Sequence, residues 1–301
     1  MREQDPSVCR RRLRKRLRQL REENGLTQTV VAQAMDWSKS KLIRIEAGQH
    51  GITANDLRAL LDYYHLTDSA VITELVEMAR NSRKHSWLSQ YKDVASDVFL
   101  TFAGYEESAV RSYSFQPVLV PGLLQTDEYA AAVLAVVRGS QEPSRINKLI
   151  ELRVARQERV FARQGELKLH YILDESVVRR AVGGAKTMRR QLAHLIELRD
   201  RADVSLRILP FSAGVYRSMR VPFVVLESSE PEDEAILYLE YPQGESLIRE
   251  DGPPEEGGIP TDESAPTAPP TYLQIFSELQ ELTSDEETAD ILQSALSALN
   301  S

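Results

Sequence analysis

The feature that most constrains the fold of this sequence is a pair of short helix patterns joined by a tight turn. The first segment, "TQTVVAQAM", is expected to be a helix that is capped by Thr27 and turns Val30, Val31 and Ala34 inward. The turn follows at residues 36–38, and the second segment, "KSKLIRIEA", has the pattern of another helix. This pair of helices sets the interpretation of the residues around it.

The second helix has a clear start and a clear end. Ser38 can cap its N-terminus, and Gly48 ends it. Leu42 and Ile45 supply its core face. The opposite face is left with basic and hydroxyl side chains.

Three further helices are predicted around this pair. Leu13, Leu17 and Leu20 form an apolar stripe on an arginine-rich first helix, and residues 53–64 and 68–82 have helix patterns with caps. Two short helices joined by a three- or four-residue turn inside a bundle of five form the helix-turn-helix arrangement. We therefore expect an all-α domain over residues 1–83.

The segment "GLTQTVVAQAMDWSKSKLIRIEAGQ" resembles the DNA-binding domain of the lambda and 434 repressors and Cro, the XRE-type helix-turn-helix family. The LTQ opening, Ala32, the S-x-S start of the second helix and the I-E-x-G ending carry the resemblance. It implies that the second helix enters the major groove of double-stranded DNA. By this resemblance the base-reading residues are Lys39, Ser40 and Arg44. Lysine and arginine can donate to O6 and N7 of guanine.

The resemblance also implies contacts with the DNA backbone. Gln28 matches a residue that binds the backbone and braces the recognition helix, and Ser38 and Lys41 are expected to hold phosphates. On the arginine-rich first helix, Arg12 and Arg16 are expected to face phosphates and make the affinity depend on salt. Two plainer interpretations stay open, because Ser38 can be a helix cap only and Lys41 can be solvated only.

Other matched positions are expected to be structural. Arg21 and Glu46 match a buried ion pair of the repressor fold, and Trp37 is expected to pack in the turn and not to stack on a base. This sequence has Asp36 where the family usually has glycine in the turn. Aspartate tolerates a positive φ better than most residues, so the turn is expected to survive.

Residues 84–301 predict a larger α+β domain with a small mixed sheet. Four short β-rich segments, "LKLHYIL", "VSLRILP", "VPFVVLE" and "AILYLEY", are expected to be strands between amphipathic helices. Residues 250–271 are rich in proline, glycine and acid, and are expected to form a flexible loop. C-terminal helices are expected over residues 272–300.

The stretches "YSFQPVLVPGLLQTDEYA", "ILDESVVRRAVGG" and "VSLRILPFSAG" resemble the C-terminal domain of unknown function of actinobacterial-type WhiJ-like regulators. With the helix-turn-helix segment, the resemblance covers nearly the whole chain. It implies regulation through a small BldB-like partner protein, and some such pairs are antitoxin–toxin-like. It identifies no ligand.

No pattern of catalytic or metal-binding residues stands out, so we expect neither an enzyme nor a cofactor. Asp174 and Glu175 follow a predicted strand and are expected to cap the next helix. His170 and Tyr171 alternate on that strand, one inward and one outward. The histidines are scattered with no metal-ligand spacing: His50, His65, His85, His170 and His194.

The charge is strongly polarised along the chain. Residues 1–50 hold 12 Lys and Arg against 6 Asp and Glu, whereas residues 226–301 hold 1 against 19. A basic head suggests a polyanionic partner, and the acidic end either solubilises the chain or restrains the head. The single cysteine, Cys9, excludes an internal disulfide, and no apolar run is long enough for a membrane span. We expect a cytoplasmic protein.

These observations favour a sequence-specific transcriptional regulator, such as a repressor. One recognition helix reads only a few base pairs, so we expect a homodimer on an inverted repeat with half-sites about 34 Å apart or a multiple of that. The alternative is an antitoxin-like module that neutralises a small partner protein and autoregulates its operon.

Overall fold

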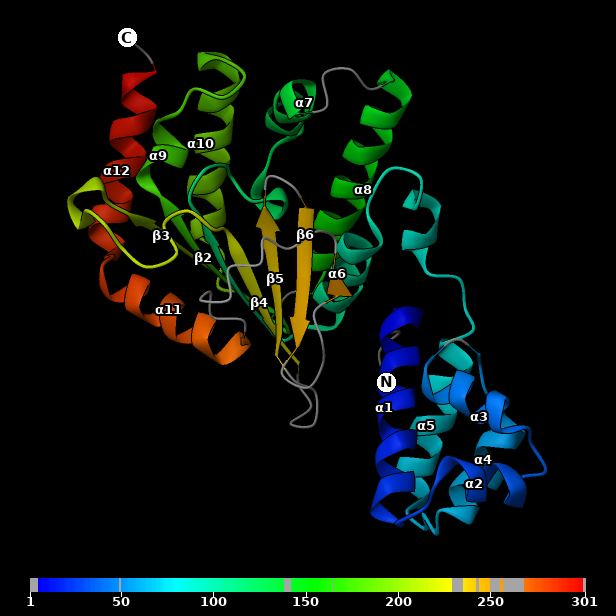
Figure 1. The fold of residues 1–301 in the computed structure, drawn as a ribbon. Coiled ribbons are helices and arrows are strands. Elements are labelled where there is room, and N and C mark those ends of the chain that lie inside the picture. The colour runs from blue at the N-terminus through cyan, green and yellow to red at the C-terminus, as the bar shows by residue number, and fades with distance from the viewer. Residues whose placement is uncertain are drawn as a thin grey trace. The chain divides into compact units, whose positions relative to one another are not determined.

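A computed structural model describes residues 5–48, 50–137, 142–163, 165–228, 235–241, 244–249, 255–256 and 268–299. The chain forms two compact units, one up to Gln90 and one from Tyr91 onward, and each is described by itself (Figure 1). Among the described helices, none combines the length and the apolar composition that a membrane span requires.

The described secondary structure of the first unit consists of helices, as expected. Its core joins Leu13, Leu17 and Leu20 of the first helix to Leu42 and Ile45 of the third. A short 3-10 helix follows the bundle. The elements are α1 (Pro6–Glu23), α2 (Gln28–Ala34), α3 (Lys39–Glu46), α4 (Ala54–Tyr63), α5 (Ser69–Asn81) and η1 (Trp87–Tyr91).

One expectation for α2 is wrong. Val30 and Ala34 are exposed, and the residues that enter the core are Val31 and Ala32. The reason is helical geometry, because Val31, Ala32 and the packed Met35 lie at i, i+1 and i+4 and share one face. The face that includes Val30 is turned to solvent.

The second unit is built on a mixed sheet that is larger than the small sheet expected. The strand order is β3-β2-β1-β4-β5-β6-β7, with β1, β2 and β3 parallel and the remaining neighbours antiparallel. The strands are β1 (Arg111–Gln116), β2 (Lys168–Asp174), β3 (Val204–Leu209), β4 (Phe223–Glu227), β5 (Ile236–Tyr241), β6 (Gly244–Arg249) and β7 (Glu255–Glu256).

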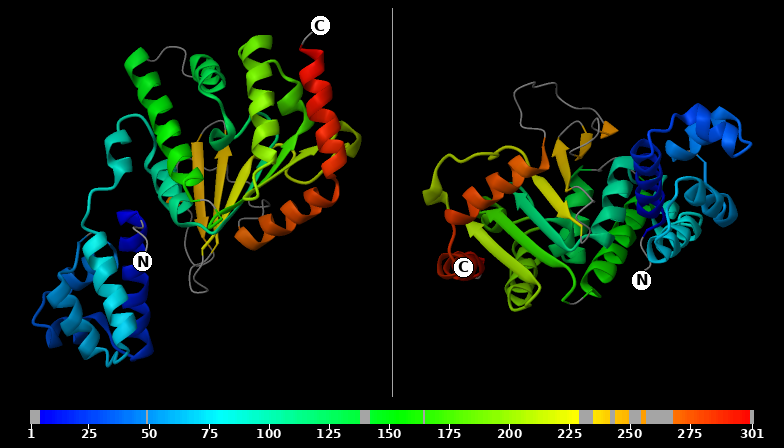
Figure 2. Two further views of the ribbon diagram at one scale, coloured as in Figure 1. Left: turned by 180° about the vertical axis from the view of Figure 1, so that it is seen from behind. Right: turned by 90° about the horizontal axis from the view of Figure 1, so that it is seen from below.

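The parallel pairs require crossovers, which the helices between these strands supply. Most helices cover one face of the sheet, and α11 covers the other (Figures 1 and 2). The elements are α6 (Asp97–Ser108), η2 (Gly122–Leu124), α7 (Asp127–Val137), α8 (Pro143–Phe161), α9 (Glu175–Arg179), α10 (Ala185–Arg199), η3 (Phe211–Ala213), α11 (Pro269–Glu281) and α12 (Asp285–Ala298).

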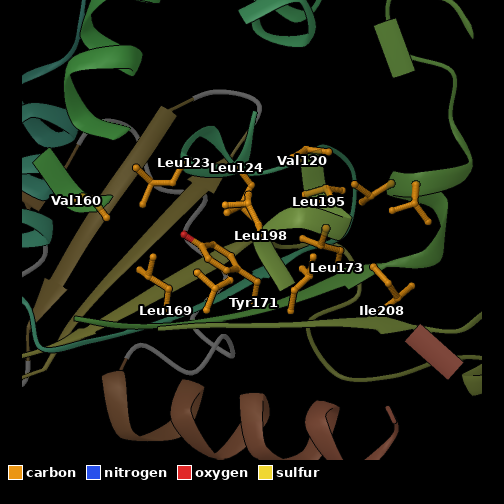
Figure 3. Close-up of a cluster of buried hydrophobic side chains, with 14 of the residues drawn as sticks. Val120, Leu123, Leu124, Val160, Leu169, Tyr171, Leu173, Leu195, Leu198 and Ile208 are labelled. Carbon is orange, nitrogen blue, oxygen red and sulfur yellow. The ribbon is translucent and has the colours of Figure 1, made fainter. Parts of the chain in front are cut away.

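Each face of the sheet has its own apolar core. Leu169, Tyr171 and Leu173 of β2 point into the larger core under α8 and α10, part of which is drawn in Figure 3. Ile172 joins the smaller core with α11, and His170 stacks on Tyr113 at 5.0 Å between ring centroids. The alternation expected for His170 and Tyr171 is present.

The C-terminal region differs in part from the sequence prediction. Within the expected loop of residues 250–271, Glu255–Glu256 pairs with β6 and α11 already begins at Pro269. Residues 250–254 and 257–267 lie outside the described part. Two helices follow, because the chain turns between Glu281 and Asp285 and Ser284 caps α12.

Candidate nucleic-acid interface

Helix α3 presents a polar face to solvent. Lys39, Ser40 and Arg44 are exposed on it, and the apolar Ile43 lies among them with 41 % of its surface exposed. The face is set by the core, because Leu42 packs inward with no exposed surface. A helix fits the major groove, so this face has the shape and the donors for reading base edges.

Ile43 is the residue of this face that the sequence interpretation missed. The sequence contained a signal for the exposure of Ile43. Leu42 and Ile45 occupy the core face of the helix, and Ile43 lies about 100° around the helix axis from Leu42. An exposed aliphatic side chain on such a face can contact the C5-methyl group of thymine.

A buried ion pair holds α3 against α1. Arg21 donates from Nε to Oε1 of Glu46 at 2.7 Å and from Nη2 to Oε2 at 3.2 Å. Gln28 donates to the same Oε2 at 2.7 Å, and Arg21 also donates to the carbonyl of Leu26 at 2.9 Å. The amide of Gln28 thus braces the end of α3 from the start of α2.

The ionised form of Arg21 is favoured by its surroundings. The hydrogen bond from Arg21 to Glu46 raises the pKa of Arg21, and this outweighs the opposing effect of burial. Nearby, burial raises the pKa of the Tyr64 hydroxyl, and the charge of Glu46 adds to that rise. Arg21 therefore stays charged at neutral pH, and its two bonds to Glu46 join α1 to the end of α3.

Both ends of α3 are closed by specific contacts. Ser38 caps the N-terminus, because its Oγ accepts from the backbone N–H of Lys41 at 3.1 Å. At the other end, Nη1 of Arg14 donates to the carbonyl of Ala47 at 3.0 Å. Gly48 adopts a φ of 73° there, and a Cβ at Gly48 would lie 3.0 Å from Nη1 of Arg14. One arginine of α1 therefore serves the C-terminus of α3, where a cation is favourable.

The turn before α3 has the strained conformation that was expected. Asp36 has a φ of 54°, in the left-handed region. Trp37 packs partly into the core of the first unit. The Lys41 amino group lies 4.0 Å from the centroid of the Trp37 ring and 3.3 Å from Oδ2 of Asp56. Lys41 is thus held beside the turn at the start of α3.

The arginines of α1 have different surroundings. Arg16 is half-buried and pairs with Glu23 at 3.4 Å, and Arg12 is half-buried near Cys9. Arg18 pairs with Glu22 at 2.9 Å. Contacts of Arg12 and Arg16 with DNA phosphates remain predictions. Several arginines of α1 already form contacts within the first unit.

In the second unit, the acidic residues singled out from the sequence have structural partners. Asp174 caps α9 through the N–H of Ser176 at 2.8 Å and accepts from the Tyr216 hydroxyl at 2.6 Å. Glu175 accepts from the N–H of Phe211 at 2.8 Å. Within the described residues, no group of His, Cys, Asp and Glu side chains is arranged to hold a metal ion.

Comparison with known proteins agrees with this division of the chain. A helix-turn-helix domain matches residues 12–72, and a domain of unknown function, DUF5753, matches residues 99–254. No curated protein and no solved structure matches the chain. Since the second match covers more than half of the 301 residues, the chain belongs to the DUF5753 family and carries a helix-turn-helix domain at its N-terminal end.

Proposed function

We propose that this chain is a sequence-specific DNA-binding regulator of transcription in the cytoplasm, and that it acts by binding and not by catalysis. The observation that carries the proposal is the exposed face of α3, where Lys39, Ser40, Ile43 and Arg44 stand together on a helix braced by Arg21. A helix of this kind is rigid enough to place donors against base edges in the major groove.

The residues have separate roles in this proposal. Lys39 and Arg44 donate to guanine, Ser40 bonds to a base edge, and Ile43 contacts a thymine methyl group. The backbone N–H groups and side chains around Ser38 position the helix on phosphates. Arg12, Arg16, Gln28 and Lys41 add further contacts with the backbone.

We further propose a homodimer on an inverted repeat, with a small BldB-like protein as partner of the second unit, in the manner of WhiJ-like repressors. Exposed apolar side chains on the second unit support a protein contact there, since Phe211 is 60 % and Val215 is 91 % exposed. In the antitoxin-like alternative, the main role of the chain is to neutralise the small partner protein, and DNA binding serves autoregulation.

The test is selection from a random pool of duplex DNA at 50 and 200 mM salt, with wild type, Arg44→Ala and Ile43→Ala. Wild type should enrich one inverted repeat. Arg44→Ala should lose about fivefold to 150-fold of its preference at one G·C position in each half-site, because a good base contact is worth about 1–3 kcal/mol. Ile43→Ala should lose preference at an A·T position.

The matched control is Arg58→Ala, which removes an exposed arginine of α4 and leaves α3 unchanged. This variant should select the same repeat as wild type. Equal loss of preference in Arg44→Ala and Arg58→Ala would show that only net charge matters. Absence of any preferred sequence with wild type would contradict sequence-specific binding by this chain alone.

A further inference from the structure

The second unit contains a cavity of about 280 Å³ on the face of the sheet opposite α11. Its walls come from β1, β5, α6, η2 and α8. Phe99, Phe102, Leu123, Leu149 and Leu152 form much of its apolar lining. This volume lies just below the range of about 300–1,000 Å³ that is typical of small-ligand sites.

Of the charged groups around this cavity, Arg156 and the carboxylates already have partners. Arg156 forms a buried bidentate pair with Glu106 at 2.9 and 3.0 Å. Glu245 accepts from the Ser96 hydroxyl at 2.6 Å, and Glu240 is engaged in another interaction. The charge of Arg156 is therefore compensated within the protein by that of Glu106.

Arg153 differs from them. Its Nη1 donates to Oε1 of Gln125, a neutral amide, at 2.6 Å. Its Nε is buried and has no hydrogen-bond partner among the described residues, and no described carboxylate forms an ion pair with it. Burial, and then the charge of Arg156, lower the pKa of Arg153 to about 10 against the opposing effect of the Glu240 charge, so the group is still a cation at neutral pH.

Gly122 leaves room beside this unused edge of Arg153. A Cβ at Gly122 would lie 3.4 Å from Nε and 4.0 Å from Nη2 of Arg153, and 3.6 Å from Nη1 of Arg156. The Nε–Nη2 edge of a guanidinium matches the two oxygens of a carboxylate. A side chain at Gly122 would therefore lie directly against this edge of Arg153.

Tyr171 adds a second unused donor. Its ring rises from β2 among the leucines of the larger core, and its hydroxyl points away from the sheet (Figure 3). This hydroxyl is buried and has no hydrogen-bond partner among the described residues, and Tyr171 is one of the residues that line the cavity. A buried polar group without a partner is costly, and functional sites are one place where such groups occur.

We propose that this cavity binds a small organic acid, in which one carboxylate pairs with Arg153, the Tyr171 hydroxyl donates a further hydrogen bond, and an apolar tail lies against Phe99, Leu123 and Leu149. The volume suits a ligand of about ten non-hydrogen atoms, since it corresponds to roughly nine water molecules at about 30 Å³ each. The proposal concerns the second unit alone and does not depend on DNA binding.

The test is calorimetric titration of the full chain at pH 7.4 with octanoate and with octanamide, which have the same size and differ in charge. Phenylacetate and phenylacetamide serve as a second pair. At least one acid should bind at least tenfold more tightly than its amide, because only the carboxylate forms a charge-assisted pair. Arg153→Gln should remove this difference by weakening the acid and leaving the amide unchanged.

Two further variants separate binding from folding. Gly122→Ala keeps the guanidinium but fills the space beside it, and should also weaken the acid at least tenfold. Arg145→Gln removes an exposed arginine of the same helix outside the cavity lining and should bind like wild type. If circular dichroism shows that Arg153→Gln does not fold, the affinity of Gly122→Ala for the acid tests the proposal instead. The proposal is overturned if neither acid binds, if acids and amides bind equally, or if folded Arg153→Gln retains the preference for the acid.

Discussion

At the residue scale, two arginines of this chain differ in how many of their guanidinium donors have hydrogen-bond partners. Arg21 directs its guanidinium to Glu46, Glu22 and the carbonyl of Leu26. Arg153 has one neutral partner and a buried Nε without any among the described residues. Because an unpaired buried donor costs free energy, the first arrangement indicates a structural role, and the second is one of the observations behind the proposed ligand site.

The same contrast between tyrosines gives a stability prediction. Tyr129 and Tyr171 are both buried, but the Tyr129 hydroxyl accepts from the N–H of Val120 at 3.2 Å, whereas the Tyr171 hydroxyl has no partner among the described residues. Without ligand, Tyr171→Phe should leave the free energy of unfolding unchanged or raise it by about 1 kcal/mol. Tyr129→Phe should lower it by about 1–2 kcal/mol, since the N–H of Val120 is left unpaired.

Urea denaturation of the two variants beside wild type measures this difference. The two changes delete the same atom at similar burial, so each is the control for the other. A loss of stability in Tyr171→Phe as large as that in Tyr129→Phe would mean that the Tyr171 hydroxyl is satisfied in solution.

At the element scale, α3 is a short helix that is held in place by contacts at both of its ends. Eight residues form too short a helix to be stable alone in water. Ser38 closes the N-terminal end, and Arg14 and Gly48 close the C-terminal end. The middle of the helix stays exposed at the face proposed to contact DNA.

Gly48→Ala tests the C-terminal end of α3. Gly48 has a positive φ, which costs other residues about 1–2 kcal/mol, and a Cβ there would also press on Arg14 at 3.0 Å. We expect a loss of about 2–3 kcal/mol in the stability of the first unit. The matched control is Gly25→Ala, which has a φ of 64° but no atom within 4 Å of the added Cβ, and should cost only about 1–2 kcal/mol.

Chemical denaturation followed by the fluorescence of Trp37 and Trp87 reports on this region. Equal losses for Gly48→Ala and Gly25→Ala would show that the contact between Arg14 and Gly48 contributes nothing beyond the backbone conformation.

At the scale of the whole molecule, the chain is two units with separate cores. The described core of the first unit lies between Leu13 and Ala79, and both cores of the second unit lie between Phe102 and Ala295. Charge follows the same division in part, since residues 1–50 are basic and residues 226–301 are strongly acidic. A unit with its own core can unfold by itself.

Calorimetry of the full chain should therefore show two transitions. Leu57→Ala and Leu192→Ala remove side chains with no exposed surface from the first and second units. Each should cost about 2–5 kcal/mol in its own unit and lower the Tm of one transition only. A single transition that both variants lower equally would show that the units unfold together.

The sequence by itself determined the local structure of the first unit and much of the second. The helix pair with its caps at Thr27 and Ser38 depends on neighbouring residues, so it was readable from the sequence. The sequence analysis did not predict strand β6, because this strand depends on pairing with β5. It also misassigned the inward face of α2, because packing against the other helices decides which face is buried.

Only the tertiary structure decided which polar groups meet. Arg14 reaches the carbonyl of Ala47 across 33 residues, and Arg153 of α8 comes to lie beside Gly122 of η2. No local pattern encodes such meetings, because they depend on how helices and sheet pack around shared cores. The pattern of one segment predicted the face proposed to bind DNA, whereas the cavity exists only where α6, η2 and α8 close over the sheet.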